Sequence, residues 1–367
     1  MKEYRVIIAG GGTGGHIFPA IAIANALKKQ QPATNLLFVG AKGKMEMEKV
    51  PQAGYPIEGL DIAGFNRSSL FKNISLPFKL VKSFFQVRRI IGKFRPHAVV
   101  GVGGYSSFPV LRYAQAKNIP TFIHESNSFA GKSNILLGKK ATRIFVAAQG
   151  MEKFFPAAKL MITGNPIRPS IRDVGTISRQ DANAFFGLDS DRKTILVIGG
   201  SLGARSVNEA IAAGLQAIDD AGLQLIWQTG KTGAAKWLEA AASYRNVRVE
   251  AFITRMEMAY AAADIVVSRA GAMATAELCA VKRPVLFVPY PFAAEDHQTA
   301  NARSLAEKHA ALMVADSEAR EKLVPMLLKL AGDPLQQQEL SGNIARHAVM
   351  NADEIIAGEI LKMTYQA

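Results

Sequence analysis

The sequence predicts an α/β fold made of two doubly wound, Rossmann-like domains that face each other across a cleft. Short apolar runs alternate with helical patterns along the whole chain, as in parallel sheets covered by helices on both faces. Glycine-rich turns follow three of these runs, at residues 10–15, 101–107 and 199–205. A chain of 367 residues is long enough for two domains. The first and third turns lie about half a chain apart, which places one of them in each domain.

In the first half, six strand candidates are separated by segments with helical patterns. The expected strands are Tyr4–Ala9, Asn35–Val39, Ala98–Val102, Thr121–His124, Arg143–Val146 and Leu160–Thr163. The expected helices include Ile17–Gln30, Lys79–Phe94 and Phe108–Lys117. Gly164-Asn165-Pro166 then interrupts the pattern, as is typical of a linker. We therefore place a first domain at 1–165.

The second half repeats this plan. Its expected strands are Thr194–Ile198, Leu223–Trp227, Val247–Ala251, Ile265–Ser268, Val285–Val288 and Ala311–Val314. Helices are expected at Ser206–Ala217 and Ala272–Ala280, and the tail from Glu339 to Tyr365 also has a helical pattern. We place the second domain at 166–345, and we expect a C-terminal helix within 346–367 to pack back on the first domain.

The net charge of +14 is unevenly distributed along the chain. Residues 1–165 contain 23 Lys and Arg against 7 Asp and Glu, whereas residues 166–367 contain 21 against 23. Between Asp61 and Glu125 there are ten basic residues and no acidic one. This asymmetry predicts an anionic partner for the first half only.

Other compositional features narrow the class of protein. The apolar stretches are too short to span a bilayer. Residues 1–27 differ from a signal peptide because Val6–Ala9 leads into a glycine turn. The single cysteine, Cys279, excludes an internal disulfide and a cysteine-rich metal site. We expect it to be a small buried side chain in a cytoplasmic protein.

The first glycine turn matches the spacing Gly10-x-Gly12-x-x-Gly15 of a dinucleotide-binding fingerprint. That fingerprint also requires an acidic residue at the end of the second strand. The strand ends Phe38-Val39-Gly40-Ala41-Lys42 instead, which argues against nicotinamide binding. We expect His16 at the first helical position, where the helix dipole favours neutral imidazole and therefore a general base. The alternative is a histidine that caps or packs the helix start.

The third turn, Gly199-Gly200-Ser201, is the better phosphate site. It follows a β-branched strand directly, and Ser201 adds a hydroxyl donor to the main-chain amides. Arg168 lies in the linker near the expected cleft, where its planar guanidinium suits a diphosphate. The alternative for Arg168 is an ordinary surface arginine.

Three look-alike motifs do not fit their usual roles. Gly131-Lys132-Ser133 and Gly230-Lys231-Thr232 lack the earlier glycine of a phosphate-binding loop. Asp189-Ser190-Asp191 precedes its strand, whereas ligands of open parallel sheets bind at the carboxyl ends. We interpret the acidic pair as a solvated turn, and we predict no metal site.

Two later segments have residues suited to a sugar nucleotide. In Ala270-Gly271-Ala272-Met273-Ala274-Thr275-Ala276-Glu277, the small residues allow a ligand near the helix start, and Glu277 can reach a ribose. In the polar segment 295–301, His297 is a second candidate base. Gln298 both donates and accepts hydrogen bonds, which suits sugar hydroxyls.

The expected helix Lys79–Phe94 has two apolar stripes. One is expected in the core and consists of Leu80, Phe84, Val87, Ile91 and Phe94. The other consists of Phe78, Val81 and Phe85, and it is flanked by Lys79, Lys82, Arg88, Arg89 and Lys93. Together with Leu70, Phe71 and Ile74, the second stripe is suited to an anionic membrane surface. The alternative is a normally buried helix with a solvated basic face.

Several segments together resemble one family, and they cover nearly the whole chain in the family's order. They are Gly11-Gly12-Thr13-Gly14-Gly15-His16, Gly103-Gly104-Tyr105, His124-Glu125-x-Asn127, Gly164-Asn165-Pro166-Ile167-Arg168, Gly199-Gly200-Ser201-x-Gly203-Ala204-Arg205, 271–277 and Gln298-x-x-Asn301-Ala302. Their combination resembles the peptidoglycan N-acetylglucosaminyltransferases.

The resemblance implies a GT-B type glycosyltransferase that is inverting and metal-independent and needs no cofactor. Its donor would be UDP-GlcNAc. The acceptor would be the 4-hydroxyl of undecaprenyl-diphosphate-linked MurNAc-pentapeptide. The resemblance also implies a peripheral location on the cytoplasmic face of the bacterial membrane.

The resemblance also assigns expected roles to individual residues. In the second domain, Ser201 and Arg168 match residues at the diphosphate, and the backbone of Ile253 matches a contact to uracil. Glu277 matches a ribose contact and Gln298 a sugar contact, with Ala272 and Met273 in the same donor-binding segment. In the first domain, the matching residues at the junction of acceptor and donor are Thr13, Gly14, Gly15 and Asn127. His16 is the candidate base.

Two other functions remain alternatives at this point. A UDP-sugar epimerase can share the two-domain plan, and it would form product without any acceptor. A nucleic-acid-binding protein would explain the sequence pI of about 9.8. However, the basic stretch is interleaved with aliphatic and Phe side chains, and it contains no recognition module. We therefore expect no nucleic-acid partner.

Overall fold

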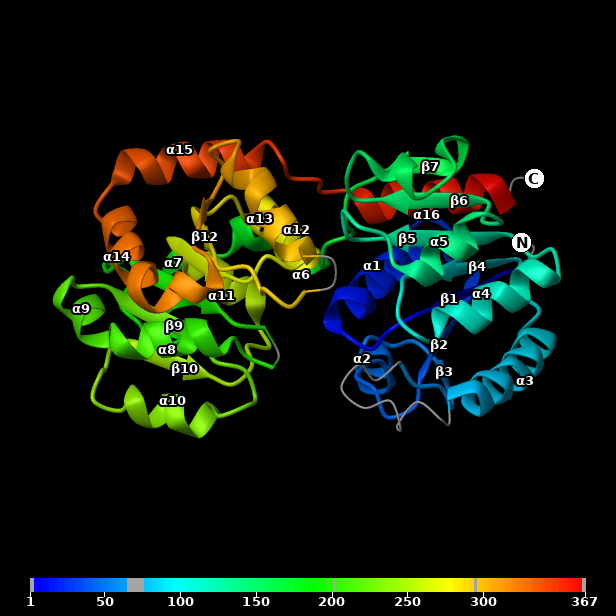
Figure 1. Cartoon of the computed structure of the whole chain (residues 1–367), viewed down its shortest axis with the longest axis horizontal. Helices are drawn as coiled ribbons and strands as arrows, with labels where there is room; N and C mark the ends of the chain where they lie inside the picture. The colour runs from blue at the N-terminus through cyan, green and yellow to red at the C-terminus, as the bar shows by residue number, and fades with distance from the viewer. Residues whose placement is uncertain (1–2, 65–75, 201, 294–295, 365–367) are drawn as a thin grey trace. The chain divides into compact units, whose positions relative to one another are not determined.

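The computed structural model describes residues 3–64, 76–200, 202–293 and 296–364, and it divides into two compact units. Unit 1 is Met1–Arg168 together with Asn351–Ala367, and unit 2 is Pro169–Met350. The boundaries fall a few residues after the predicted ones. Both units consist of a parallel sheet with helices (Figure 1), so the predicted α/β class of two Rossmann-like domains is confirmed.

Unit 1 contains a seven-stranded parallel sheet in the order β3-β2-β1-β4-β5-β6-β7. The strands are β1 (Tyr4–Ala9), β2 (Thr34–Ala41), β3 (Ile57–Leu60), β4 (Ala98–Gly101), β5 (Thr121–Glu125), β6 (Arg143–Val146) and β7 (Leu160–Ile162). The sequence patterns did not predict β3. This edge strand is four residues long and contains Glu58 and Gly59, two residue types that are depleted in strands.

The helices of unit 1 cover both faces of this sheet. They are α1 (Gly14–Gln30), α2 (Glu46–Gln52), α3 (Leu76–Phe94), α4 (Ser107–Ala116), α5 (Lys132–Gly138) and α16 (Ala352–Thr364). Helix α1 begins after Thr13, whose φ of −142° and ψ of 159° are extended. It ends with Lys28 and Lys29, which suit the negative end of the helix dipole.

Helix α16 belongs to unit 1 although it is the last element of the chain (Figure 1). It packs on α1 through a buried face that includes Ile356 and Ile360. Its Glu359 accepts from Arg143 at 2.8 Å, an ion pair that lies largely out of solvent. The helical pattern of 339–365 corresponds to two helices, because α15 (Pro334–Ala345) ends in unit 2 and residues 346–351 separate it from α16.

Unit 2 contains a six-stranded parallel sheet in the order β10-β9-β8-β11-β12-β13. The strands are β8 (Thr194–Ile198), β9 (Gln224–Gln228), β10 (Val247–Glu250), β11 (Ile265–Ser268), β12 (Val285–Phe287) and β13 (Leu312–Met313). The other helices of unit 2 are α6 (Pro169–Arg172), α7 (Arg179–Phe185), α8 (Arg205–Ala213), α9 (Leu215–Asp220), α10 (Ala234–Ala240), α11 (Met256–Ala262), α12 (Ala272–Val281), α13 (His297–Ala306) and α14 (Ala319–Ala331).

The predicted helix Ser206–Ala217 is divided at Gly214 into α8 and α9. A Cβ at Gly214 would lie 2.6 Å from a methyl group of Val324 on α14. The glycine therefore allows α14 to pack closely on α8, and it interrupts the helix at the same point.

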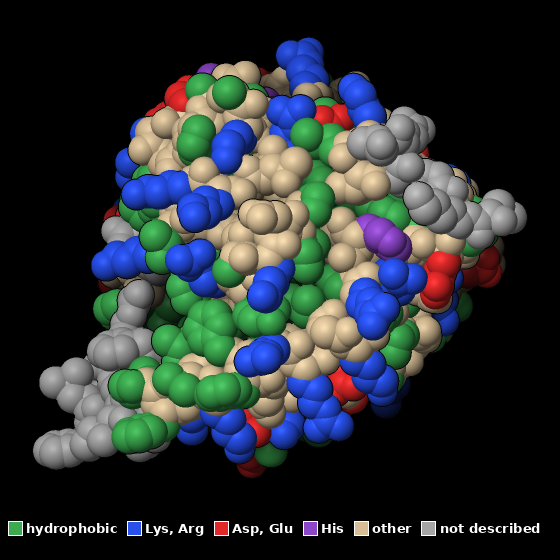
Figure 2. Space-filling model, turned by 90° about the vertical axis from the view of Figure 1, so that its right-hand side faces the viewer, with side chains coloured by type: hydrophobic (Ala, Val, Ile, Leu, Met, Phe, Trp, Pro, Cys, Tyr) green, Lys and Arg blue, Asp and Glu red, His purple; other side chains and the backbone are tan. Residues whose placement is uncertain are grey.

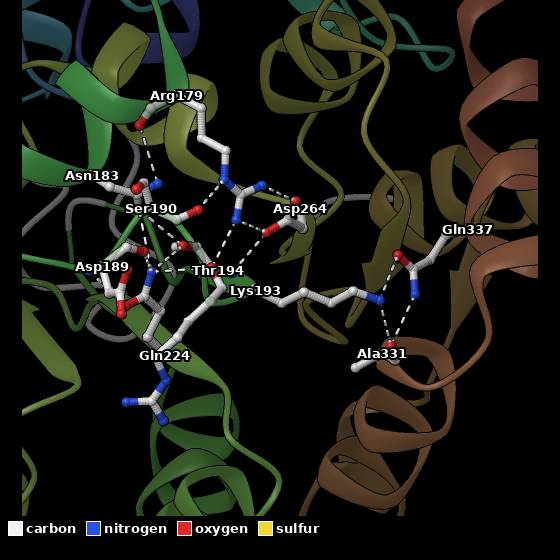
Figure 3. A network of polar contacts seen from close by, with 11 residues as sticks. Arg179, Asn183, Asp189, Ser190, Lys193, Thr194, Gln224, Asp264, Ala331 and Gln337 are labelled. Carbon is white, nitrogen blue, oxygen red and sulfur yellow. Dashed lines mark hydrogen bonds and ion pairs between the residues drawn. The ribbon is translucent and has the colours of Figure 1, made fainter.

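The amino-terminal edge of this sheet is held by a polar network centred on Arg179 (Figure 3). Its guanidinium pairs with Asp264 and donates to the carbonyl oxygens of Ser190 and Arg192 at 3.0 and 2.7 Å. In the turn Asp189-Ser190-Asp191, the Asp189 carboxylate accepts from the main-chain N–H of Asp191 at 2.9 Å. The acidic pair therefore forms a structural turn at the edge opposite the glycine turn.

Candidate functional site

In unit 1, two glycine turns meet at the carboxyl ends of β1 and β4. The strand order reverses between these two strands, and ligands of open α/β sheets bind at such a point. Gly11 donates its N–H to the carbonyl oxygen of Gly103 at 3.2 Å. A Cβ at Gly104, whose φ is +87°, would lie 2.3 Å from the carbonyl oxygen of Gly11. Only glycine allows the two turns to pack this closely.

His16 lies on these turns as the third residue of α1, so its predicted place at the first helical position is wrong. The helix begins at Gly14, two residues earlier, because Thr13 accepts the first helical hydrogen bonds. His16 Nδ1 lies 3.1 Å from the carbonyl oxygen of Gly11. Because a carbonyl only accepts, Nδ1 is the protonated nitrogen and Nε2 has the lone pair. A Cβ at Gly103 would lie 2.8 Å from Nε2, so Gly103 leaves room for the ring.

Two histidines and two carboxylates interact electrostatically here. Burial lowers the pKa of His16 below its usual value, while the charges of Glu125 and Glu46 and the bond to Gly11 oppose that shift. Burial, with the neighbouring His16 adding to it, lowers the pKa of the fully buried His124 to about 4. Both rings are therefore neutral at pH 7, and a neutral His16 is able to accept a proton.

The predicted residue Asn127 is held by Glu125 at the end of β5. One carboxylate oxygen of Glu125 accepts from the main-chain N–H and the side-chain amide of Asn127, at 3.1 and 3.2 Å. The other oxygen accepts from Gly131 N–H at 3.2 Å and from Asn134 at 2.8 Å. The buried Glu125 thus fixes the whole loop after β5. It stood in the motif His124-Glu125-x-Asn127, but we had assigned it no role.

Arg168 lies in unit 1, with its guanidinium 4.9 Å from the centre of the Phe18 ring on α1. The predicted boundary at 165/166 had placed it in the second domain. Since Phe18 follows His16 by two residues, the arginine lies over the same helix start that carries the histidine.

In unit 2, a second glycine turn joins β8 to α8, again where the strand order reverses. Gly199 donates its N–H to the carbonyl oxygen of Gln228 at 3.2 Å. A Cβ at Gly203, whose φ is +88°, would lie 2.2 Å from the carbonyl oxygen of Thr229. The predicted phosphate ligand Ser201 lies outside the described residues.

The other residues predicted to bind the UDP-sugar also lie near the carboxyl ends of strands in unit 2. The main-chain N–H of the buried Ile253 donates to the side-chain oxygen of Gln228 at 3.1 Å. A base contact at Ile253 therefore uses its carbonyl oxygen or displaces Gln228. Ala272 and Met273 are half-buried in the first turn of α12.

Two of the polar residues predicted to bind the UDP-sugar are held by neighbouring groups. The buried Glu277 carboxylate accepts from the Tyr260 hydroxyl at 3.4 Å. The Gln298 side-chain oxygen accepts from the main-chain N–H of Tyr290 at 3.0 Å. Asn301, one turn further along α13, donates to the carbonyl oxygen of Ala270 at 3.0 Å and so ties α13 to the turn before α12.

Arg269 is a functional candidate that the sequence reasoning missed. It follows β11, pairs with Asp316, and donates to Ser206 Oγ at 3.2 Å and to the Val288 carbonyl oxygen at 2.9 Å. Ser206 is the second residue of α8, so the mostly buried guanidinium lies beside the helix start that follows the glycine turn. Its sequence neighbours Ser268 and Ala270 give no signal for this position.

Helix α3 exposes the second predicted apolar stripe. Phe78, Val81 and Phe85 are 78%, 57% and 67% exposed. Figure 2 shows hydrophobic side chains gathered in the lower part of the view, with Lys and Arg side chains around them. The predicted core stripe is wrong at Leu80, which is exposed, because the buried positions are Ser83, Val87 and Ile91. The predicted neighbours Leu70, Phe71 and Ile74 lie outside the described residues.

One basic residue of this helix is already paired. Lys82 and Lys42 both bind Asp61, at 2.8 and 3.0 Å, and they lower the pKa of that carboxyl to about 2. Gln86 also donates to Asp61 at 3.1 Å. Asp61 therefore ties the middle of α3 to the segment after β3.

Within the described ranges, no group of three or more His, Cys, Asp and Glu side chains is arranged to hold a metal ion. The helices of the same ranges include none with the length and apolar content needed to cross a bilayer.

Both halves of the chain match one glycosyltransferase family. The glycosyltransferase family 28 N-terminal domain matches residues 6–146, and the family 28 C-terminal domain matches residues 194–355. A protein of Phocaeicola vulgatus is 51% identical over 365 residues, which cover 99% of this chain and 97% of that protein. It is named UDP-N-acetylglucosamine–N-acetylmuramyl-(pentapeptide) pyrophosphoryl-undecaprenol N-acetylglucosamine transferase. A protein of Bacteroides fragilis with the same name is 50% identical and covers 99% of this chain and 96% of its own length.

Solved structures agree with this fold. The crystal structure of MurG from Acinetobacter baumannii has a TM-score of 0.75 and 29% identity, and the match covers 98% of this chain and 100% of that one. A UDP-N-acetylglucosamine 2-epimerase structure has a TM-score of 0.71 at 15% identity, over 100% of this chain and 98% of that one, a likeness in fold alone.

Proposed function

Because the chain belongs to glycosyltransferase family 28, we propose that unit 2 binds the UDP-sugar donor and unit 1 the lipid-linked acceptor. The chain is an N-acetylglucosaminyltransferase of peptidoglycan synthesis. It transfers GlcNAc from UDP-GlcNAc to undecaprenyl-diphosphate-linked MurNAc-pentapeptide. The observation that carries this conclusion is the 51% identity, over 99% of the chain, to a protein named for that transfer.

Unit 2 offers the groups that a UDP-sugar requires. Its glycine turn leads into α8, and the positive end of that helix suits a diphosphate. Arg269, paired with Asp316, bonds to Ser206 in the first turn of α8 and so holds this helix start in place. The carbonyl oxygen of Ile253 can accept from a uracil N–H, and Glu277 can accept from ribose hydroxyls. Ala272, Met273 and Gln298 lie at the same ends of the strands, where the sugar would bind.

We assign the base to His16 in a single displacement with inversion. The 4-hydroxyl oxygen of the acceptor bonds to the anomeric carbon as the bond from that carbon to the UDP oxygen breaks. The hydroxyl proton passes to Nε2, the nitrogen left unprotonated by the Nδ1 contact to Gly11. Thr13, Gly14, Gly15 and Asn127 would position the acceptor next to His16.

The charge that develops on UDP would be met without a metal ion. We assign this charge to the main chain at Gly200 and Ser201, to the start of α8 and to the Arg168 guanidinium. The N–H groups of Gly199 and Gly203 already bond to the carbonyl oxygens of Gln228 and Gly200. The test is donor turnover with a lipid-linked muramyl acceptor in EDTA. Full turnover supports the proposal, and strict dependence on added magnesium would contradict it. In the same assay, UDP-GlcNAc conversion without an acceptor would favour the epimerase alternative.

We further propose that unit 1 binds the anionic cytoplasmic surface of the membrane through α3, and that nucleic acid is not a partner. The exposed Phe78, Val81 and Phe85 would enter the interface while Lys79 and Arg88 contact lipid phosphates.

Vesicles with and without anionic lipid test the membrane proposal by sedimentation. Replacing Phe78 and Phe85 with Ser should weaken binding about tenfold or more. Leu238→Ser, an exposed apolar position on α10 of unit 2, is the matched control. Binding that ignores anionic lipid and salt would refute the membrane proposal.

A further inference from the structure

Glu46 is a buried carboxylate beneath the first glycine turn. It is the first residue of α2 and only 1% exposed. One of its oxygens accepts from Gly12 N–H at 2.7 Å, and the other accepts from Ala41 N–H at 2.9 Å. The carboxylate therefore joins the end of β2 to the turn that follows β1.

Two glycines form the space that the carboxylate occupies. A Cβ at Gly11, whose φ is +148°, would lie 2.3 to 2.7 Å from the three carboxyl atoms of Glu46. A Cβ at Gly40 would lie 2.5 Å from its Cγ. Neither position has room for a side chain while Glu46 is in place. Part of the glycine pattern in this region is thus explained by a buried acid and not by a ligand.

The amides of the turn are already used within the protein. Gly10 donates to the carbonyl oxygen of Val39 at 3.1 Å, Gly11 donates to Gly103, and Gly12 donates to Glu46. A phosphate at these three amides would have to break those bonds and approach a buried negative charge, which is unfavourable. The first turn is therefore poorly suited to cradle an anion.

The same turn carries the base. Gly11, whose Cα lies against Glu46, provides the carbonyl oxygen that holds Nδ1 of His16. We propose that Glu46 is a positioning residue for the transfer reaction, because it fixes the main chain of the first glycine turn so that this turn orients His16. This inference rests on the proposed role of His16 as the base.

Glu46 also acts on the charge of His16. Three titratable groups influence the ring: Glu46 from α2, and Glu125 and His124 from the end of β5. Both carboxylates raise the pKa of His16 against the lowering by burial. Removing the charge of Glu46 therefore lowers the pKa of His16 further, and this shifts the acid limb of kcat/KM to lower pH.

The experiment compares Glu46→Gln with Glu48→Gln, an exposed carboxylate on the same helix. A glutamine has only one acceptor oxygen for the two N–H groups, so we expect kcat to fall about ten- to a hundredfold. KM for UDP-GlcNAc and UDP binding by calorimetry should stay unchanged, and the His16 ring signal in NMR should titrate at lower pH. Glu48→Gln should match the parent in every measurement.

A second variant leaves the carboxylate in place but displaces it. Gly40→Ala puts a methyl group against Glu46 Cγ and should lower kcat in the same way. Parent-like kcat and parent-like titration of His16 in Glu46→Gln would overturn the proposal. So would loss of UDP binding in both variants, because Glu46 would then be needed only for folding.

His16→Ala separates this proposal from the one on which it depends. If His16→Ala keeps parent turnover, the assignment of the base fails regardless of Glu46. If His16→Ala is inactive while Glu46→Gln is fully active, only the role of Glu46 fails.

Discussion

The two glycine turns at the carboxyl ends of β1 and β8 look alike in sequence but have different electrostatic surroundings. The turn in unit 1 lies on the buried carboxylate of Glu46, and the amides of Gly10, Gly11 and Gly12 are used internally. The turn in unit 2 leads into α8, where Ser206 bonds to both members of the ion pair Arg269–Asp316, so no unpaired carboxylate is seen there among the described residues. A glycine-rich turn after a strand thus indicates close main-chain packing. The charge beneath it decides whether an anion can bind there.

The largest effect should come from removing the chemistry that we assign to the first turn. His16→Ala should lower kcat by about 10²- to 10⁴-fold, the usual contribution of a general base. The affinity for UDP should stay within a fewfold of the parent, because His16 is not among the residues that we assign to UDP binding. Steady-state kinetics and calorimetry with UDP check this. Turnover within a fewfold of the parent would mean that His16 is not the base.

Matched alanine substitutions in the two turns sharpen the comparison. Gly104→Ala and Gly203→Ala each place a Cβ about 2 Å from a carbonyl oxygen at a φ near +88°. Each should therefore cost about 2–4 kcal/mol of stability. The first should lower kcat and leave UDP affinity unchanged, whereas the second should weaken UDP binding.

Gly342→Ala is the control for these substitutions. It adds a Cβ in open space on α15 and should raise stability by about 0.5–1 kcal/mol. Scanning calorimetry measures all three variants. Equal losses of UDP affinity in Gly104→Ala and Gly203→Ala would remove the distinction between the turns.

The buried histidines His124 and His16 predict that the stability of unit 1 depends on pH. The unfolded chain protonates His124 below its ordinary pKa of 6.5, but the folded protein does so only below about 4. The contribution of His124 to the free energy of unfolding is therefore complete above pH 6.5. It should decrease by about 3 kcal/mol as the pH falls to 4. The lowered pKa of His16 acts in the same direction. Denaturant unfolding between pH 4 and 7 measures the slope, and His124→Asn should reduce it.

The smallest expected effect concerns Glu277 in unit 2. Glu277→Gln keeps one acceptor oxygen and removes the charge, so the donor KM should rise about tenfold. Glu239→Gln, on α10 of the same unit, should leave it unchanged. A rise in KM limited to the acceptor would place Glu277 outside the donor site.

The strands were predictable where their signal is local. The runs Tyr4–Ala9, Thr194–Ile198 and Ile265–Ser268 are mostly apolar, and β1, β8 and β11 have these same limits. β3 was missed because a short edge strand with Glu58 and Gly59 has no apolar pattern. The break at Gly214 depends on Val324 of α14, a contact that no local pattern contains.

The site was predictable only in part, because some of its residues have no local sequence signal. Glycine turns and His16 carry a local signal. Glu46 does not, because the segment Lys44-Met45-Glu46-Met47-Glu48-Lys49 resembles an ordinary charged surface helix. Its burial depends on Gly11 in the turn after β1 and on Gly40 in β2. Arg269 likewise acquires its role from Asp316 and Ser206, which are far away in the sequence.

The placement of α16 affects how the protein is made. Unit 1 is interrupted in sequence by the whole of unit 2, and α16 covers α1 through Ile356 and Ile360. On the ribosome, the whole of unit 2 is translated before α16, the segment that completes unit 1. The face of α1 that α16 covers therefore stays open during almost all of synthesis, and unit 1 completes its fold after the sequence of unit 2 has been made.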